Sequence, residues 1–418
     1  MQINIEKGHS NMAGLKLFPV SGINNVSNDD ALQQGGDNPK LYVKDAINVD
    51  ITDTGRVRLR NGAELVTELN FKNIWQSPLH QDVFATLNGQ LVKLDPLTWN
   101  YDVLESGIND SIVCYEIINN HVFIATQDKI YRYDGLKLQA LGIDTPAAPI
   151  AQISEGGTLG HGEYTIAISY SRGGLESGLS ESIKCVVIPD NSNIGDSKHT
   201  SIRVTFPYVL DQSVTHVNLY VTTRNGMELR KFATYPVQTY QAIIDQCDSL
   251  GKAAQFVAMS AMPSGLFLKY WQGRLVTALK NILRFSQAMA YHIHDERHDF
   301  VMLPQRITFL LPVDGGIWVG QVDHVVFLSG NEPNQMSFSK KSAHAPVPYS
   351  AIEVESDLVG GDISQGGAKT ALWLSENGYV MGTSTGQIIE LHAGVIKGLS
   401  AKAGRSVRLD RRVTTLVS

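Results

Sequence analysis

The chain has 418 residues, of which 43% are hydrophobic and 18% are charged, a composition typical of globular domains with ample apolar surface for a core. Its formal net charge of −6 argues against a general nucleic-acid-binding protein, because such proteins carry a basic excess. Its three cysteines lack the spacing of a metal site and are expected to be reduced thiols in a chain assembled in a cytosol. The N-terminus does not have the pattern of a signal peptide, and no run of 18 apolar residues predicts a membrane span.

The first elements in the chain are an extended segment over residues 1–40 and a hairpin over residues 45–62, DAINVDITDTGRVRLRNG. Alternation of apolar and polar residues on both sides of a Thr-Gly turn predicts the hairpin. One face of its second strand is basic and carries Arg56, Arg58 and Arg60. We expect the hairpin to pair with strands around 403–410 and close a ring of sheets, which would hide sheet edges. A nucleic-acid-binding arm is the less favoured alternative.

Five segments then repeat one pattern: an apolar strand, a turn with Asn, Asp or Gly, and an alternating strand. They are 83–95, 122–134, 275–286, 317–329 and 372–382. A repeat of about 40 residues built from short strands has the size of a blade of a β-propeller. The sequence therefore predicts an all-β protein with a β-propeller of about five to six blades. A set of unrelated hairpins in a β-sandwich is the alternative.

The repeat also predicts which residues are structurally equivalent. If the five segments are blades, one large apolar residue of each should occupy the same strand position, buried between neighbouring blades. These residues are Phe84, Phe123, Val276, Trp318 and Trp373.

The long step between the second and third repeats contains more than one blade. Segments 163–170, 201–206 and 215–221 alternate cleanly and are separated by turn residues, as in a β-sandwich. We expect residues 146–250 to be an inserted immunoglobulin/fibronectin-like β-sandwich. The other parts are then the N-terminal segment, 1–40, and two propeller parts, 41–145 and 251–418, the second with the ring closure. Residues 249–262 fit either a short helix or an extended return.

Two glycine-rich motifs resemble catalytic ones. Gly382-Thr383-Ser384-Thr385-Gly386 matches the G-x-S-x-G nucleophile elbow, but the residues after it resemble a strand, whereas the elbow requires a helix. Residues 361–370 approach a phosphate-binding loop, but two residues separate its second glycine from the lysine. We expect a hairpin turn at the first motif and no phosphate site at the second.

Residues 292–299, HIHDERHD, are rich in groups that bind metals. In a strand, His292 and His294 would point the same way, so a surface zinc site is sterically possible. A polar loop joining two blades is the favoured interpretation, because no second cluster of ligands stands out. The sequence thus assigns no catalytic, cofactor-binding or metal-binding residue, and we expect no enzymatic activity and no cofactor.

Parts of the chain resemble virion proteins of bacteriophages. The resemblance rests on SGINN at 21–25, KDAINVD at 44–50, GRVRLRNG at 55–62, YHI at 291–293, PVDGGIWVG at 312–320 and ALWLSENG at 371–378. The inserted part, with GEYTI at 162–166 and SRGGLESGLS at 171–180, looks like the fibronectin type III-like module of phage structural proteins.

The resemblance implies a structural role in a phage tail, most closely in the hub or nozzle of short-tailed phages, also described as packaged-DNA stabilisation. It implies a hexameric ring that contacts neighbouring tail proteins such as a portal adaptor, fibre or needle. DNA would be only passing cargo. The location would be the virion tail, assembled in the cytoplasm of the bacterial host. A receptor- or carbohydrate-binding propeller at the tail tip is the alternative.

Overall fold

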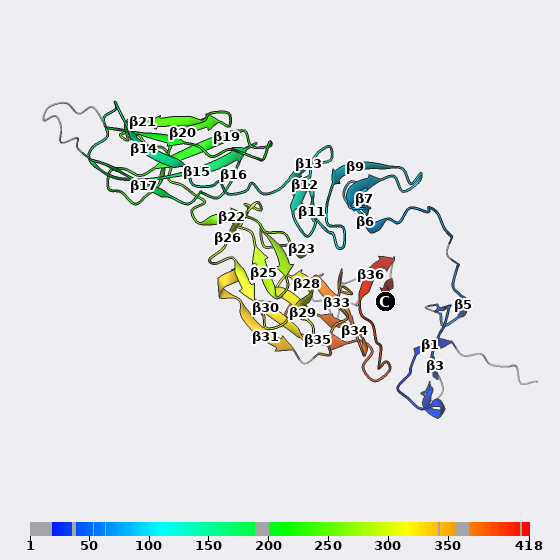
Figure 1. The fold of residues 1–418 in the computed structure, drawn as a ribbon. Coiled ribbons are helices and arrows are strands. Elements are labelled where there is room, and N and C mark those ends of the chain that lie inside the picture. The colour runs from blue at the N-terminus through cyan, green and yellow to red at the C-terminus, as the bar shows by residue number, and fades with distance from the viewer. Residues whose placement is uncertain are drawn as a thin grey trace, which may run out of the picture.

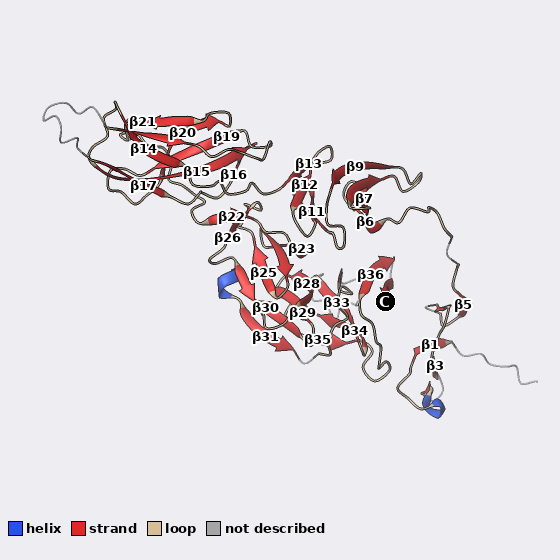
Figure 2. Cartoon of the chain, viewed as in Figure 1, coloured by secondary structure: helices blue, strands red, loops and turns tan. Residues whose placement is uncertain are grey.

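The computed structural model describes residues 19–35, 39–52, 54–62, 64–188, 200–341, 343–355, 368–409 and 412–418. Within these ranges the chain consists of strands, turns and two short 3-10 helices, η1 (Asp29–Ala31) and η2 (Pro333–Gln335), and it contains no α-helix (Figure 2). The all-β class is therefore confirmed. The undecided stretch 249–262 contains a strand, β22 (Met259–Ala261), so the extended interpretation holds for its end.

Five four-stranded antiparallel sheets follow one another along the chain (Figure 1). Sheet 1 contains β6 (Lys72–Gln76), β7 (Val83–Leu87), β8 (Gln90–Leu94) and β9 (Tyr101–Ser106). Sheet 2 contains β10 (Cys114–Ile118), β11 (His121–Ala125), β12 (Ile130–Tyr133) and β13 (Leu138–Ala140). Sheet 3 contains β23 (Leu266–Trp271), β24 (Arg274–Leu279), β25 (Ile282–Phe285) and β27 (Phe300–Met302).

Sheet 4 contains β28 (Ile307–Val313), β29 (Gly316–Gln321), β30 (Val325–Ser329) and β31 (Ser337–Lys341). Sheet 5 contains β32 (Ile352–Val354), β33 (Thr370–Ser375), β34 (Gly378–Gly382) and β35 (Ile388–Glu390). A sixth sheet has two strands only, β36 (Gly404–Leu409) and β37 (Arg412–Val417). Strand β22, which precedes sheet 3, pairs with β26 (Ile293–Asp295), which lies in the connection between β25 and β27.

The five predicted hairpins are confirmed as the second and third strands of sheets 1–5. The five residues predicted to be equivalent all lie on second strands, and each is at most 3% exposed. Four of them face the next sheet along the chain, but Trp373 faces the preceding sheet and packs against Trp318, so its position is not equivalent. Both faces of these central strands are covered by neighbouring sheets, which explains why their side chains form nearly continuous apolar runs.

Neighbouring sheets pack against each other in chain order. One apolar cluster joins each successive pair, and the pairs of side chains that represent these clusters are Phe84 with Ile124, Phe123 with Leu275, Phe285 with Leu328, Trp318 with Trp373, and Leu372 with Val413. The free energy that stabilises sheets 1–6 therefore comes from apolar surface buried between neighbouring sheets. Each sheet depends on its neighbours for its core.

The N-terminal region forms two small sheets. The predicted hairpin is present as β4 (Val49–Ile51) and β5 (Val57–Leu59), and β1 (Val20–Ile23), β2 (Gln33–Gln34) and β3 (Lys40–Val43) form the other sheet. The expected pairing with the C-terminal strands is not present in the described chain, where β4–β5 and β36–β37 are separate sheets.

The segment between sheets 2 and 3 forms two sheets of its own. One contains β14 (Ile150–Ser154), β18 (Ser201–Thr205) and β21 (Gln241–Ile244). The other contains β15 (Gly162–Arg172), β16 (Leu175–Glu176), β17 (Ile183–Val187), β19 (His216–Val221) and β20 (Arg230–Pro236).

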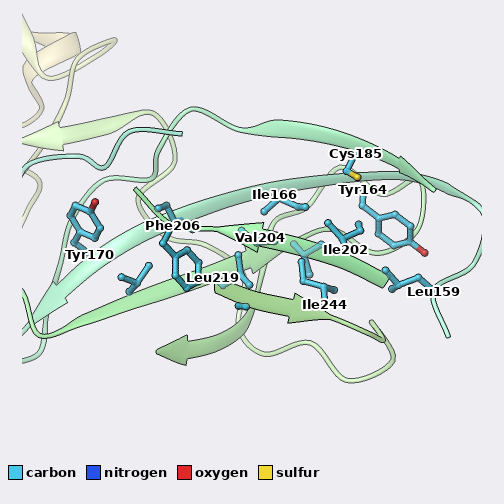
Figure 3. Packing of buried hydrophobic residues seen from close by; sticks show 14 of the residues in the cluster. Leu159, Tyr164, Ile166, Tyr170, Cys185, Ile202, Val204, Phe206, Leu219 and Ile244 are labelled. Carbon is cyan, nitrogen blue, oxygen red and sulfur yellow. The ribbon is translucent and has the colours of Figure 1, made fainter. Parts of the chain in front are cut away.

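These two sheets enclose one apolar core (Figure 3). Ile166 and Leu219 of one sheet and Ile202 and Ile244 of the other are fully buried in it. Ile143 also belongs to this core, although it precedes the boundary at residue 146 that the sequence suggested. We call residues 143–250, which include Ile143, the two-sheet unit.

Candidate functional site

The first strands of the sheets surround a cavity of about 800 Å³. Each of the six sheets contributes its first strand to the lining, namely β6, β10, β23, β28, β32 and β36, and Leu416 of β37 also lies in it. A concave site built from several elements is the usual starting point when a function is sought. We call it the central cavity.

Aromatic rings in the wall of the central cavity contact one another. Trp75 and Tyr115 are stacked, with ring centroids 5.0 Å apart and an interplanar angle of 1°. The Tyr115 hydroxyl donates to the main-chain oxygen of Asn73 at 3.0 Å, and burial raises the pKa of Tyr115 above its usual value. Opposed to them, the rings of Phe267 and Tyr349 lie 5.5 Å apart. Because these faces are engaged with each other, they form a wall more than a stacking platform for a ligand.

The charged groups of the central cavity are also paired. Lys269 lies 3.4 Å from Glu116, and Lys369 lies 2.8 Å from Glu353, which raises the pKa of Lys369 through the hydrogen bond. The Arg405 guanidinium lies 5.3 Å from the ring centroid of Tyr349. These contacts leave little unbalanced charge in the wall.

The cavity also holds one thiol. The sulfur of Cys114 accepts a hydrogen bond from the main-chain nitrogen of Phe267 at 3.2 Å. The described lining contains no histidine that could activate this thiol as a nucleophile. The chemistry of the wall is therefore that of a packed surface.

The G-x-S-x-G motif lies in the turn between β34 and β35, as expected. The turn is closed by the Thr383 side-chain oxygen, which accepts a bond from the nitrogen of Gln387 at 3.0 Å, and by the Thr383 carbonyl, which accepts one from the nitrogen of Gly386 at 3.2 Å. No helix follows the motif, so the geometry of a nucleophile elbow is absent.

The metal-capable cluster at 292–299 is occupied by internal contacts. The Nδ1 of His294 lies 2.8 Å from the carbonyl oxygen of Phe285. Both carboxylate oxygens of Asp295 accept hydrogen bonds from Arg297, at 3.0 Å each, and these bonds lower the pKa of Asp295. Burial raises the pKa of Asp299, which lies 3.6 Å from the Arg274 guanidinium.

Among the described residues, no group of three or more histidine, cysteine, aspartate or glutamate side chains is arranged to hold a metal ion. The cluster is not only a polar loop, because it contains β26 and most of its side chains are buried. The cluster does not join two sheets as expected, because it lies between β25 and β27 of sheet 3, and its side chains fix that connection.

The remaining sequence candidates contribute no further chemistry. Residues 361–367 of the phosphate-loop-like stretch lie outside the described residues, and Thr370 begins β33. On the hairpin, Arg58 and Arg60 lie 3.7 and 3.5 Å from Asp50. The basic face is therefore partly neutralised within the hairpin itself.

A buried polar junction that the sequence did not reveal attaches the two-sheet unit to the rest of the chain. Arg172, 4% exposed, donates to the main-chain carbonyls of residues 140–142. The Nε2 of His292 lies 3.1 Å from the carbonyl oxygen of Glu176. Burial lowers the pKa of both Arg172 and His292. Arg172 of the two-sheet unit and His292 of the rest of the chain thus each bind main-chain carbonyls across the junction. We call this pair of contacts the clamp.

Tight backbone packing adds to this clamp. A Cβ placed on Gly178 would lie 1.8 Å from the carbonyl oxygen of Met259, so no larger residue fits there. Sequence patterns gave no sign of the junction, because its partners lie far apart along the chain. In the described part of the chain no helix has the length and apolar character of a membrane span.

Comparisons with known proteins give weak likenesses. No family model and no curated protein matches the chain. The extracellular domain of a one-component system from B. thetaiotaomicron aligns at 13% identity and a TM-score of 0.22, covering 84% of this chain and 57% of that domain. The chain thus spans less than two thirds of that neighbour.

Two shorter structures align over most of their length. A chain of the mitotic checkpoint complex aligns at 11% identity, a TM-score of 0.21, and coverage of 77% of this chain and 94% of that one. The AfRom2 CNH domain aligns at 7% identity, a TM-score of 0.24, and coverage of 79% and 91%. At such scores these likenesses carry no argument about function.

Proposed function

We propose that sheets 1–6 are the blades of a β-propeller, interrupted by a fibronectin type III-like module, and that the chain is a structural subunit of a bacteriophage tail. Two observations support the propeller: successive meander sheets share apolar clusters in chain order, and the first strand of each sheet lines the central cavity. In the proposed arrangement the subunit belongs to a ring-shaped hub or nozzle in the virion.

The observation that carries the assembly role is the unfinished sixth sheet. Sheets 1–5 have four strands each, whereas sheet 6 has two, and a separate two-stranded hairpin lies in the N-terminal region. Long apolar side chains are exposed on both, among them Leu59 and Leu416. Exposed apolar residues at open strand edges promote aggregation in a monomer, whereas in an assembly they can form the contacts between subunits.

The charges of the chain are consistent with a channel wall that does not bind DNA. The net charge is −6, and the arginines of the hairpin are partly paired with Asp50. Such a surface repels phosphate more than it binds it, so DNA can pass without being held. In this proposal the partners are further copies of the chain, in a hexameric ring, and adjacent tail proteins.

The proposal is tested by locating the protein. Gold-labelled Fab fragments raised against the two-sheet unit should mark the tail of intact particles, and the purified chain should form rings visible by negative-stain electron microscopy. Binding of duplex DNA should be weak at physiological salt, measured by fluorescence anisotropy. Particles that never carry the label, together with a chain that stays monomeric, would overturn the structural role.

A further inference from the structure

Sheet 6 ends after its second strand. Strand β37 pairs with β36 on one side, and no other described strand pairs with it. Apolar side chains of β37 are partly uncovered: Val417 is 50% exposed, and Leu416, which is 71% exposed, lines the central cavity. An edge of this kind presents a row of backbone donors and acceptors that another strand can use. What sheet 6 lacks, by comparison with sheets 1–5, is its two outer strands.

The hairpin β4–β5 is a pair of strands without a sheet. Neither strand pairs with any other described strand, and Leu59 is 78% exposed. The charges of its basic face are partly balanced by Asp50, which contacts Arg58 and Arg60. The hairpin thus offers two strands with uncovered apolar side chains.

The order of the chain favours one arrangement of the four strands. In sheets 1, 3 and 4 the outermost strand leads directly into the first strand of the next sheet. Strand β5 leads into β6 of sheet 1 in the same way, through residues 60–71. The order β36-β37-β4-β5 therefore reproduces the pattern of the complete sheets, with β4 beside β37.

The hairpin of the same copy is held elsewhere. The Val20 nitrogen donates to the Gly55 carbonyl at 3.0 Å, which fixes the hairpin beside β1. Asn25 in turn is bonded to the loop after β35, with its nitrogen donating to Val395 at 3.0 Å and its amide paired with the backbone of Lys397 at 2.9 Å. With these anchors in place, the hairpin and β37 belong to separate two-stranded sheets within the described chain.

We infer that the β4–β5 hairpin of one copy completes sheet 6 of a second copy, with β4 antiparallel to β37 and β5 outermost. This inference rests on the proposed assembly role. Each copy donates one hairpin and accepts one, a head-to-tail contact that closes when the copies form a ring. The backbone groups and exposed apolar side chains of both elements are satisfied in a single step.

The test asks which copy supplies the hairpin. A photo-crosslinking benzophenone amino acid replaces Ile47, which is 80% exposed and precedes β4. Equal amounts of nitrogen-15-labelled and unlabelled protein are mixed as dilute chains, concentrated, irradiated and digested. Mass spectrometry should find crosslinks from position 47 to residues 412–418, with mixed-isotope pairs as frequent as same-isotope pairs. The same probe at Met227, which is 99% exposed on the two-sheet unit, should not reach this segment.

Each other outcome has a meaning. If all crosslinked pairs carried the same isotope in both partners, the chain would complete its own sheet. This result would overturn strand exchange and leave the structural role intact. A ring without crosslinks to 412–418 would show that this edge is not the docking site. A chain that neither self-associates nor occurs in tails would instead defeat the proposed function.

A pair of substitutions separates docking from folding. Leu59→Asp in the hairpin should weaken self-association by about tenfold or more, and the melting of the isolated chain should hardly change because the side chain is exposed there. Leu136→Asp is the matched control, since Leu136 is 89% exposed in the turn after β12. Equal effects of both substitutions on association would contradict the inference.

Discussion

The indole nitrogen of Trp318 in sheet 4 donates a hydrogen bond to the main-chain carbonyl of Thr383 in sheet 5, at 2.9 Å. The ring of the same tryptophan lies 5.5 Å from that of Trp373. Neighbouring sheets are therefore joined both by apolar contact and by a polar bond inside the interface. This contact allows the two contributions to be separated.

Trp318→Phe should destabilise the protein more than Trp373→Phe. Both rings are fully buried, but the indole nitrogen of Trp373 has no hydrogen-bond partner among the described residues. Only the first substitution removes a hydrogen bond, and because the Thr383 carbonyl keeps its bond from the Gly386 nitrogen, we expect a cost of about 0.5–1.5 kcal/mol. Urea denaturation of both variants provides the measurement. Equal losses of unfolding free energy in the two variants would show that the hydrogen bond contributes nothing. Trp318→Ala, which removes the whole ring, should lower the unfolding free energy by about 3–5 kcal/mol.

The sequence predicted the five hairpins because their signals are local: apolar alternation and a turn residue such as Asn88, which has a positive φ of 49°. It did not predict the first and fourth strands, because their burial follows no single pattern: β6 and β9 are mostly exposed, whereas β28 is buried along its whole length. It also did not predict that Ile143 belongs to the core of the two-sheet unit, because Ile143 gains this place only through contact with residues far along the chain.

The candidate site was still less predictable. The central cavity is lined by residues such as Trp75 and Tyr349 that are distant in sequence and adjacent only after the sheets pack. The motifs that stood out in the sequence, at 292–299 and 382–386, form structural contacts. The role of Arg172 could not be predicted, because the sequence around an arginine does not show whether its side chain is buried against three carbonyls or exposed to solvent.

The junction around His292 should respond to pH. Burial, with the nearby Arg172 charge as a smaller contribution, lowers the pKa of His292 below the usual value of about 6.5, while the Glu176 carbonyl acts in the opposite direction. The unfolded chain therefore binds a proton that the folded chain resists, so stability falls as pH drops through about 6.5. Thermal melts between pH 8 and pH 5.5 should show this loss.

His292→Gln should reduce that loss, because glutamine does not titrate and can still donate to the Glu176 carbonyl. His216→Gln, at an exposed position, serves as the control and should retain the full pH dependence. Hydrogen exchange of residues 140–142, whose carbonyls Arg172 binds, would report whether the junction opens. An unchanged slope in the His292 variant would assign the pH effect to another group.

The two-sheet unit should fold alone, and its stability should depend on where it is cut. A fragment of residues 142–250 contains Ile143, which is fully buried in the core, whereas a fragment of residues 146–250 lacks it. We expect both fragments to be β-rich by circular dichroism and the shorter one to be less stable by about 2–5 kcal/mol, as for a large apolar deletion. Ile143→Ala in the longer fragment is the matched control. A disordered long fragment would contradict the independence of the unit.

The turn at 382–386 should matter for its shape and not for its serine. Ser384→Ala should leave assembly and infectivity nearly unchanged, because no observation gives the hydroxyl a catalytic partner in the described structure. Gly382→Ala should reduce both, because a Cβ there would lie 2.4 Å from the ring of Trp318, and Gly62→Ala is the control at an open position. Plaque assays and particle composition measure the outcome. If Ser384→Ala abolished infection in normally assembled particles, the structural role would be replaced by an enzymatic one.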